Sequence, residues 1–353
     1  MYVCVYVSSM YCYNLSHSDQ LHVNPSEHPI LFSEASYVTR QEREAAVQHL
    51  FESTSTPAIF SVKSAVLAAF ASAKATAIVV DCGGGGTTVT AVHDGYCLTQ
   101  SIMRSPLGGD MMTSCMERAL EKENVKVRPI YEFKKKLATA DQGHGATVGD
   151  TEFQVIDLDF PKTTESYRRY CVSNIVRDCK ESILRVSEVA YDEGLNANVP
   201  TMSYELPDGH VVEIGPERFR IPESMYDPSL LSKYDVGEGK IDVPSLKGLH
   251  SMVIESISKC DPDVRKDLFA SVLLSGGNSV LPNMKERLEK ELIAVGPQNS
   301  KIKVLAQQAQ LERRFSSWIG GSILASLGSF QQMWLSKAEY EEHGAAHIHR
   351  KSP

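Results

Sequence analysis

Apolar residues recur along the first part of the chain at two different spacings, and each spacing predicts a type of element. Glu42 lies three residues after Thr39, which is the arrangement of a capping box and indicates a helix N-terminus. Apolar side chains then recur at helical spacing from Val47 to Phe51. We therefore expect a helix that begins after Thr39 and ends near Ser53.

A second helix is expected immediately afterwards. Thr56 and Pro57 indicate its start, because proline suits the first helical position. Its apolar body, Ala65 to Phe70, is expected to be buried. The next apolar run, Ala75 to Asp81, is rich in β-branched residues and predicts a strand that ends on an acidic side chain.

Four consecutive glycines, Gly83 to Gly86, follow this strand and predict a turn. A second strand is expected from Thr87 to His93, and Asp94-Gly95 predicts a tight hairpin into a third strand from Tyr96. These elements form a small antiparallel unit. Their order excludes the strand–turn–helix context of a Rossmann or P-loop nucleotide site.

The middle of the chain, residues 108–246, is more polar and less regular. The lysine run Lys134 to Lys136 and the segment Gly143 to Asp150 predict a surface loop. Pro207-Asp208-Gly209 lies between two apolar runs and predicts a hairpin.

A second glycine turn follows a strand late in the chain. The apolar run that ends at Leu274 predicts the strand, Gly276-Gly277 the turn, and Pro282 the start of a helix. Glycines let a backbone approach a phosphate closely, and consecutive N–H groups can bind an anion. Asp81, at the end of the earlier strand, is the residue type that holds a magnesium-bound water. Either turn alone is better explained as an ordinary turn. The pair together is more suggestive of a phosphate site but is not specific for one.

The composition is that of a globular protein and argues against several functional classes of protein. The chain has 353 residues, with 36 basic and 44 acidic side chains and a net charge of −8. This acidic balance argues against direct sequence-specific binding of nucleic acid. No apolar run approaches the ~20 residues that span a bilayer, so no membrane partner is expected. Eight cysteines are scattered without zinc-ligand spacing, which predicts reduced, mostly buried thiols in an intracellular protein.

From His28 onward the chain resembles actin, through motifs that occur in the family's order, and the similarity covers about nine-tenths of the chain. The motifs are HPILFSEA (28–35), TPAIF (56–60), VVDCGGGGTT (79–88), HDGYCL (93–98), RDCKES (177–182), YELPDGHVVEIGPERFRIPE (204–223), KCDPDVRKDLF (259–269), LLSGGNS (273–279) and RRFSSWIGGSILASLGSFQQMWLSKAEYEEHG (313–344). Within the family, SPLGGD at Ser105, TTESYRRYC at Thr163 and ERRFSSWIGG at Glu312 resemble the nuclear actin-related proteins of chromatin remodelling and histone acetyltransferase complexes.

The resemblance implies an α/β fold of the actin, Hsp70 and hexokinase type, with two lobes around an ATP cleft. The implied parts are an atypical N-terminal segment (1–27), a first lobe (28–71 and 312–353), a second-lobe core (72–107 and 247–311) and a second-lobe outer subdomain (108–246). Nothing in residues 1–27 resembles the family's first phosphate hairpin. We therefore expect the first lobe to be incomplete at the N-terminus, with Tyr2 to Tyr13 supplying one substitute strand.

The resemblance also implies a site for ATP with Mg²⁺, in which Asp81 matches the acid that positions the metal. The other implied cofactor-binding residues are Gly83, Gly84 and Gly85 of the second phosphate loop, the base and ribose contacts Arg177, Lys180 and Glu181, the adenosine loop Gly276, Gly277 and Asn278, and Arg314 beside the adenine. In a helix, the base and ribose contacts share one face at i, i+3 and i+4. Because the first phosphate hairpin is missing, ATP binding is expected to be weakened.

Three positions depart from the family's catalytic pattern. Ser64 aligns with the glutamine that orients the attacking water, Thr88 with the catalytic-site histidine, and Gly84 with an acid of the second phosphate loop. In-line phosphoryl transfer depends on positioning and charge stabilisation, so their loss should cost orders of magnitude in rate. We therefore assign no catalytic residue and expect no enzymatic activity.

The resemblance predicts a nuclear actin-related scaffold of a chromatin-modifying assembly. Its implied partners are a helix of the remodeller ATPase, actin or another actin-related subunit, and further subunits of the complex. The helix would bind an apolar cleft lined by the C-terminal helices from Ser316 onward. The alternative is a cytoskeletal, filament-forming, ATP-hydrolysing actin relative in the cytoplasm, and a third is a non-functional splice or gene-model product.

The remaining residue types of chemical interest are given structural roles. His343, His347 and His349 lack an acid or cysteine that would complete a metal site, so a solvated tail is expected. Trp318 and Trp334 are expected to be buried. Cys82, beside the first glycine turn, is expected to pack rather than react.

Overall fold

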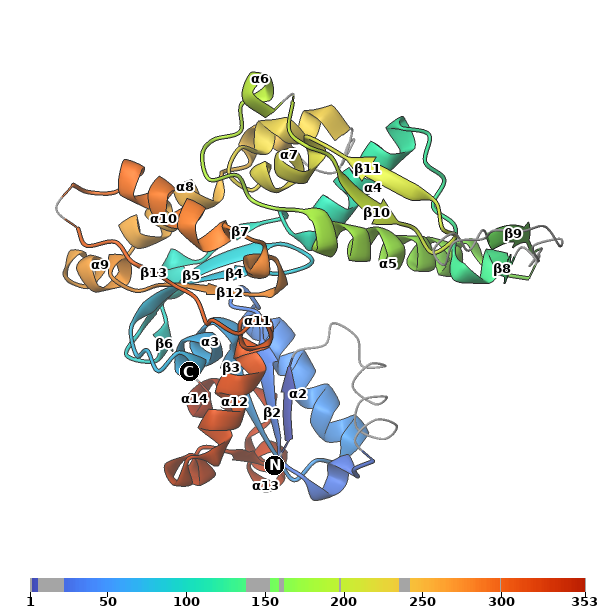
Figure 1. Ribbon diagram of the computed structural model, residues 1–353. Coiled ribbons are helices and arrows are strands. Elements are labelled where there is room, and N and C mark those ends of the chain that lie inside the picture. Colours follow the sequence, from blue (N-terminus) through green and yellow to red (C-terminus); the bar gives the residue numbers. More distant parts are fainter. Residues whose placement is uncertain are drawn as a thin grey trace, which may run out of the picture. The chain divides into compact units, whose positions relative to one another are not determined.

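The structure is a computed structural model that describes residues 2–5, 22–137, 153–158, 162–196, 198–234, 242–298 and 300–352. The chain divides into two compact units. The first unit consists of Met1–Gly108, Leu249–Val280 and Met284–Pro353, and the second of Gly109–Gly248 and Leu281–Asn283 (Figure 1).

The first unit contains two mixed sheets. One sheet has the order β1 (Tyr2–Val5), β2 (Ile30–Glu34), β3 (Ala58–Lys63) and β14 (Leu335–Ser336). The other has the order β13 (Val304–Leu305), β12 (Val272–Ser275), β4 (Ala77–Cys82), β5 (Thr87–His93) and β6 (Tyr96–Cys97), with β7 (Met103–Ser105) also paired to β5. The expected substitute strand is confirmed for Tyr2–Val5, which pairs in parallel with β2, whereas residues 6–13 lie outside the described part of the chain.

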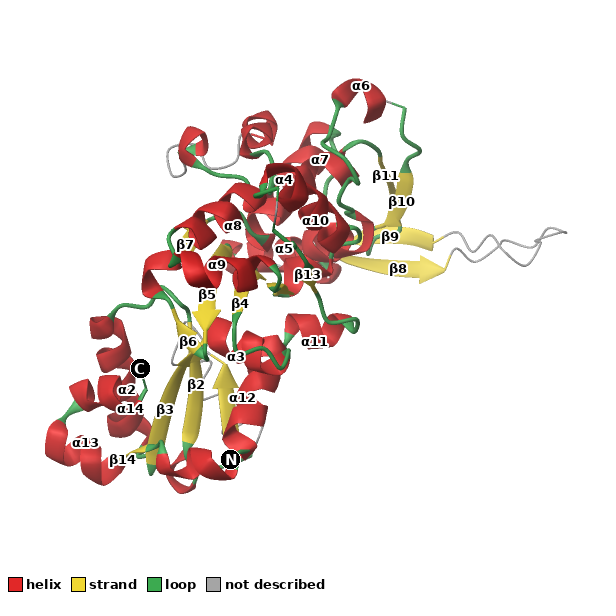
Figure 2. Cartoon of the chain, turned by 90° about the vertical axis from the view of Figure 1, so that its left-hand side faces the viewer, coloured by secondary structure: helices red, strands yellow, loops and turns green. Residues whose placement is uncertain are grey.

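Helices cover both faces of the first sheet, so its inner strands are apolar on both sides (Figure 2). Ile30 and Phe32 point to one face, where they pack with α2 (Arg40–Thr54) and α14 (Ile348–Lys351). Leu31 points to the opposite face, into the core that holds α3 (Ser64–Ala71) and α12 (Ser316–Ser326). The two-residue period of a strand therefore divides the apolar residues of β2 between two cores.

The first predicted helix is confirmed and the start of the second is wrong. The α2 helix begins after Thr39, and the predicted capping box is present: the Thr39 side chain accepts from the Glu42 N–H, and the Glu42 side chain accepts from the Thr39 N–H. After Pro57, however, the chain forms β3, and the helix α3 begins only at Ser64. Proline at the first position favoured a helix. However, β3 pairs with β2 on one side and with β14 on the other, and as a strand it buries its β-branched and aromatic side chains.

The predicted antiparallel unit is confirmed. Strands β4 and β5 pair in antiparallel fashion, and β6 returns along β5. The connecting residues Asp94 and Gly95 have φ of 49° and 81°, which is the left-handed pair that a tight hairpin turn requires. The remaining helices of the first unit are α8 (Leu249–Ser258), α9 (Pro262–Phe269), α10 (Met284–Val295), α11 (Gln310–Arg314) and α13 (Lys337–His343).

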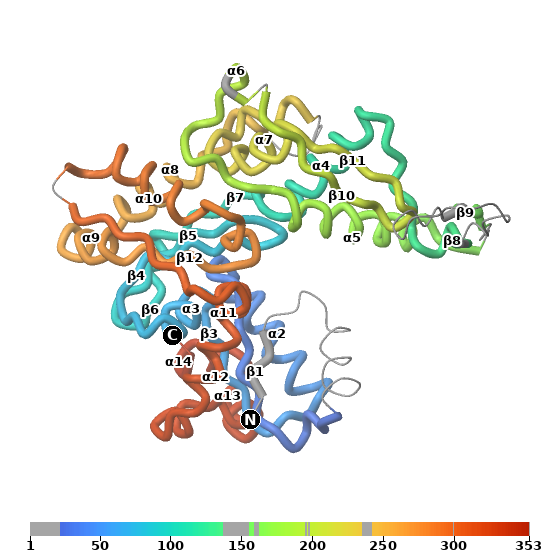
Figure 3. The backbone as a smooth tube through the Cα atoms, viewed as in Figure 1, coloured from blue at the N-terminus to red at the C-terminus, as the bar shows by residue number. Residues whose placement is uncertain are grey.

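The second unit is built on two antiparallel ribbons and several helices. Its helices are α4 (Gly109–Lys122), α5 (Glu165–Ile183), α6 (Glu193–Asn196) and α7 (Glu217–Glu223). The predicted hairpin is confirmed as β10 (Met202–Glu205) and β11 (Val211–Ile214), and β10 lies beside α5 (Figure 3).

The surface loop predicted at the lysine run is wrong. Lys134 to Lys136 belong to strand β8 (Phe133–Leu137), which pairs with β9 (Phe153–Asp157). No local signal marks this pairing, because the partner strand follows after an interval of 15 residues. Residues 143–150 lie outside the described part of the chain.

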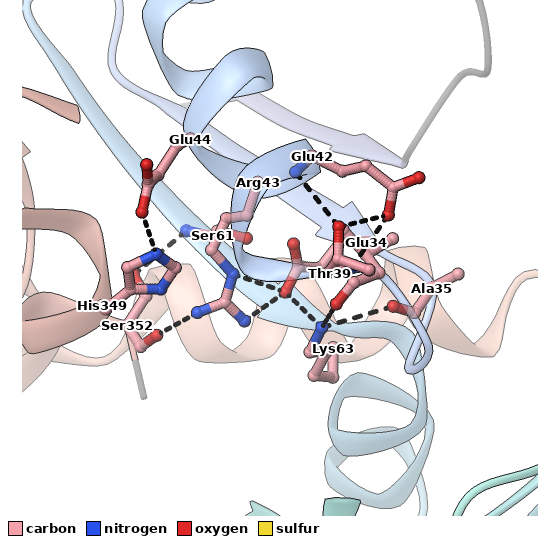
Figure 4. Close-up of polar contacts among 11 residues, drawn as sticks. Glu34, Ala35, Thr39, Glu42, Arg43, Glu44, Ser61, Lys63, His349 and Ser352 are labelled. Atoms are coloured by element: carbon pink, nitrogen blue, oxygen red, sulfur yellow. Dashed lines mark hydrogen bonds and ion pairs between the residues drawn. The ribbon is translucent and has the colours of Figure 1, made fainter. Parts of the chain in front are cut away.

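The end of the described chain packs into the first unit, so the expected solvated tail is wrong for His349, although His343 is exposed. Ile348 and Ser352 are buried. His349 Nε2 lies 2.9 Å from Oε1 of Glu44 on α2 (Figure 4). Ile348 joins the core between α2 and the first sheet, and this apolar contact holds the segment in place.

A buried ionic cluster joins the same segment to the sheet (Figure 4). Oε1 of Glu34 accepts hydrogen bonds from Arg43 Nε at 2.8 Å and forms an ion pair with Lys63 Nζ at 2.9 Å. Arg43 Nη1 also donates to the carbonyl oxygen of Ser352 at 2.7 Å. All four residues are buried, and two cations therefore compensate one carboxylate away from water.

Candidate functional site

Three polar residues form a row across the second sheet of the first unit. In the strand register, Asp81 of β4 lies opposite Thr88 of the antiparallel strand β5 and opposite Ser275 of the parallel strand β12. Because β4 and β12 run in the same direction, their carboxyl ends meet at one edge, and both glycine turns begin there. This is the edge at which open α/β sheets bind ligands.

The turn after β4 is held by close backbone contacts. The Gly83 N–H donates to the Gly86 carbonyl at 3.0 Å. A Cβ on Gly86 would lie 2.5 Å from the Ser105 oxygen, and a Cβ on Gly108 would lie 2.5 Å from the Gly86 nitrogen. Gly85, by contrast, has no atom within 4 Å of its Cβ position. The protein's own packing thus requires glycine at 86 and 108, while the tip at Gly85 is open.

The turn after β12 packs on the acidic end of β4. Gly276 has φ of +88°, and a Cβ there would lie 2.5 Å from Asp81 Oδ1. Asn278 Nδ2 donates to the Gly83 carbonyl at 2.6 Å and so joins the two turns directly. Gly277 has no atom within 4 Å of its Cβ position. The two motifs, 195 residues apart in the sequence, therefore form one continuous backbone surface around Asp81.

An arginine that the sequence reasoning missed supports the second turn. Arg313 Nη1 donates to the Ser279 carbonyl at 2.7 Å, and the Gly276 N–H donates to the Arg313 carbonyl at 3.1 Å. Burial lowers the pKa of the Arg313 guanidinium. The residue assigned to the adenine, Arg314, is next in the chain and exposed. Two consecutive arginines thus have different environments, and only the tertiary contacts distinguish them.

The electrostatics of the row favour a cation near Asp81. Burial raises the pKa of the Asp81 carboxyl, because its charged form is poorly solvated there. No ion pair to Asp81 is found among the described residues. The oxygen groups here are the Asp81 carboxylate and the Thr88 hydroxyl, which are of the kind that magnesium and its water ligands prefer, while the Ser275 hydroxyl is hydrogen-bonded to Ser316 Oγ at 2.6 Å. The residues present therefore fit a hydrated Mg²⁺ bound next to a phosphate.

The positions that depart from the family's catalytic pattern are also in the first unit. Ser64 is the first residue of α3, and its carbonyl accepts from Ser317 Oγ at 3.3 Å. Thr88 shares a sheet face with Asp81, because residues paired across a ladder point to the same side. Gly84 is exposed in the turn.

The three residues assigned to base and ribose contacts lie on α5, in the second unit. The helix is confirmed, but the side chains differ in environment. Arg177 and Glu181 are exposed, whereas Lys180 is buried and its ammonium donates to the Gly109 carbonyl at 3.1 Å. Their role in nucleotide binding stays a prediction.

Other candidate chemistry is structural in the described part of the chain. The six described cysteines are free thiols, and burial raises the pKa of Cys115 and of Cys179 to about 12. Cys82 is completely buried, and its pKa is raised by that burial and by the neighbouring Asp81. Among the described residues, no three His, Cys, Asp or Glu side chains are arranged to hold a metal ion. None of the described helices is long and apolar enough to cross a membrane.

Comparison with known proteins gives consistent matches over nearly the whole chain. The actin family model matches residues 9–353. Actin-related protein 4 of Oryza sativa subsp. indica is 52% identical over 341 residues, which are 97% of this chain and 75% of the relative. Actin-related protein 4 of Arabidopsis thaliana is 50% identical over 334 residues, 94% of this chain and 74% of the relative. The SWI/SNF and RSC complexes subunit arp42 of Schizosaccharomyces pombe is 31% identical over 346 residues, 96% of this chain and 80% of the relative.

Proposed function

The chain belongs to the actin family, and we propose that it is a nuclear actin-related subunit of chromatin remodelling and histone acetyltransferase complexes. The observation that carries the proposal is the similarity over most of the chain to Actin-related protein 4 together with a relative named as a subunit of the SWI/SNF and RSC complexes. The motifs at Ser105, Thr163 and Glu312 support the same branch of the family.

An exposed apolar helix face supports the partner that we propose, a helix of the remodeller ATPase. Trp318, expected to be buried, is 50% exposed, because α12 turns a different face toward α3. On that inner face, Gly320 packs directly on the Leu67 backbone carbonyl. Outer residues of α12 and the turns that follow it are large, apolar and more than 40% exposed: Trp318, Ile323, Leu327 and Met333.

Exposed apolar side chains of this kind are better buried against the apolar face of an amphipathic helix than left in contact with water. In helix-in-groove recognition an amphipathic helix lays its apolar face on an apolar surface of the receptor, and these exposed side chains on and after α12 offer such apolar area. Large apolar side chains that are exposed within a short stretch of chain are candidates for an interaction site. We propose that this surface, Trp318, Ile323, Leu327 and Met333, binds the remodeller helix, with actin or another actin-related protein as a second partner.

We further propose that the first unit binds ATP with Mg²⁺ without significant hydrolysis. Asp81 would hold the hydrated metal, the Gly83–Gly86 turn the phosphates, and Gly276, Gly277 and Asn278 the nucleoside side. When bound, the metal supplies charge neutralisation for the phosphates. The residues at 64, 84 and 88 give no carboxylate, imidazole or amide to orient a water. Nucleotide binding would then have a structural role.

The second candidate function is a hydrolysing, filament-forming actin relative. It is favoured by the presence of Asp81 at the end of β4 and by the packing of both glycine turns around it. The side chains at 64, 84 and 88 count against it, because placement of the nucleophile is most of what a phosphoryl-transfer site contributes.

The test is recovery of the tagged chain from nuclear extract, followed by identification of its partners by mass spectrometry. We expect a remodeller ATPase or acetyltransferase subunits, and loss of the ATPase from the double variant Ile323→Asp, Leu327→Asp. The matched control is Ile293→Asp, which changes an isoleucine that is 60% exposed on α10. Recovery of cytoskeletal proteins alone, or equal loss in the control, would contradict the proposal.

A further inference from the structure

The second unit contains a cavity of about 540 Å³ between the η4 turn (Ile130–Glu132), α5 and β10. This volume is within the range of roughly 300–1,000 Å³ typical of ligand pockets. Nine residues line it: Ile130, Tyr131, Tyr167, Cys171, Asn174, Ile175, Asp178, Tyr204 and Pro207. All of them belong to the second unit, whereas the Asp81 site and the α12 surface belong to the first.

One face of α5 forms a wall of the cavity. The five α5 residues that line it, at positions 167, 171, 174, 175 and 178, recur at the spacing of a single helix face. Ile175 is buried at the base, whereas Tyr167 and Ile130 are 53% and 69% exposed at the rim. The cavity therefore has an apolar base and a wide, partly apolar entrance.

Three tyrosine rings surround this space. The rings of Tyr131 and Tyr167 stack with their centroids 5.7 Å apart and form one continuous aromatic surface. Tyr204 comes from β10, and its hydroxyl donates to Asp178 Oδ2 at 2.5 Å. Burial and the Asp178 carboxylate raise the pKa of Tyr204, so the phenol stays neutral. This hydrogen bond positions the carboxylate and leaves its other oxygen available.

The charge of the cavity is negative. Asp178 is the only lining residue with a formal charge at neutral pH, and none of the nine is lysine or arginine. Arg168 lies nearby on α5, but its Nε donates to Glu132 Oε1 at 2.7 Å and its charge is compensated there. Tyrosine faces attract cations electrostatically. The Asp178 carboxylate, which is exposed at the cavity, adds a formal negative charge to that attraction.

We propose that this cavity binds a methylated lysine side chain of a partner polypeptide. An unmodified ammonium is strongly hydrated and carries three N–H donors that each need an acceptor. The cavity offers mainly apolar and aromatic surface, with one carboxylate. Methylation keeps the positive charge and replaces donors by methyl groups, which match the tyrosine faces. The exposed Ile130 and Tyr167 at the rim provide contact area for the residues on either side of the lysine.

The full chain, labelled with ¹³C at isoleucine methyl groups, provides the test. Ile130 and Ile175 report from the rim and the base of the cavity. The probe is the peptide acetyl-Gly-Lys(trimethyl)-Gly-amide, compared with the same peptide carrying unmodified lysine and with a neutral peptide in which carbon replaces the trimethylated nitrogen. We expect saturable shifts of both methyl groups by the first peptide, and roughly tenfold weaker binding of the other two.

Two pairs of variants complete the test. Tyr167→Leu should abolish the shifts, and its matched control Tyr170→Leu, which changes a tyrosine that is 60% exposed on the same helix but outside the lining, should not. Asp178→Asn should weaken binding, and Tyr204→Phe, which keeps the ring, should weaken it less. Unchanged methyl resonances elsewhere show that each variant is folded. Equal binding of the neutral peptide, absence of shifts at saturating trimethyl peptide, or equal loss in Tyr170→Leu would each overturn the proposal.

Discussion

Gly276 packs directly on Asp81: a Cβ at position 276 would lie 2.5 Å from the Asp81 Oδ1 atom. The two residues are 195 positions apart, yet β4 and β12 end side by side and bring them together. Only a glycine lets the second turn come this close while the carboxyl group keeps its place in the polar row.

We expect Gly276→Ala to destabilise the first unit by more than about 2 kcal/mol. The left-handed backbone alone costs an alanine roughly 1–2 kcal/mol, and the collision with Asp81 adds to this. Urea unfolding followed by circular dichroism measures the loss. The control is Gly277→Ala, whose Cβ would meet no atom within 4 Å and should leave the midpoint nearly unchanged. Equal effects of the two changes would show that the packing on Asp81 is unimportant.

Gly320→Ala should also be strongly destabilising. A methyl group there would collide with the Leu67 carbonyl where α12 crosses α3, and backbone atoms yield less readily than side chains. Overpacking of a core typically costs about 1–3 kcal/mol, and we expect the upper part of this range. Thermal unfolding gives the value. Gly328→Ala, where nothing lies within 4 Å of the added carbon, is the matched change and should have little effect.

The buried ionic cluster predicts a large loss in Arg43→Met. Without the guanidinium, Glu34 keeps only Lys63 as a counter-charge and Ser352 loses its donor. Breaking a buried pair typically costs about 3–5 kcal/mol, because the remaining charge is left without compensation. The exposed pair Arg118–Glu121 provides the comparison, and Arg118→Met should cost about 1 kcal/mol or less. A similar unfolding free energy for both variants would contradict this account.

Acid should weaken the C-terminal packing through Glu339. Hydrogen bonds from Lys351 and from the Ser336 N–H lower the pKa of Glu339 to about 2 in the folded protein. The unfolded value is about 4.3, so the stabilisation is fully present above that pH and is lost as the pH falls toward 2. In Glu339→Gln the melting temperature should therefore fall less steeply below pH 4.5 than in the wild type. Glu341→Gln, on the same helix, should follow the wild-type curve.

Steady-state phosphate release should be orders of magnitude below that of polymerised actin. The side chains at 64, 84 and 88 do not orient a nucleophile, and each factor of ten in rate corresponds to about 1.4 kcal/mol of lost transition-state stabilisation. Purified protein with Mg-ATP gives the turnover. A rate equal to that of polymerised actin, and abolished in Asp81→Ala, would instead identify a hydrolysing enzyme.

The amino-acid sequence by itself determined the elements whose signals are local. The capping box at Thr39, the β-branched run of β4 and the Asp94-Gly95 hairpin depend on residues a few positions apart, and all are confirmed. The motifs at Asp81 and at Gly276 were visible for the same reason, and the family membership that they indicate is shown.

Tertiary structure decided the features that depend on distant partners. Strand β3 forms because β2 and β14 pair with it, although its proline suggested a helix, and β8 forms because β9 is available. Trp318 is exposed because Gly320 fixes which face of α12 is buried. The contacts by which Arg313 and Gly108 support the two turns could not be predicted from the local sequence either. Each contact joins residues more than 20 positions apart. Such a contact becomes favourable only when burial and backbone pairing bring the residues together.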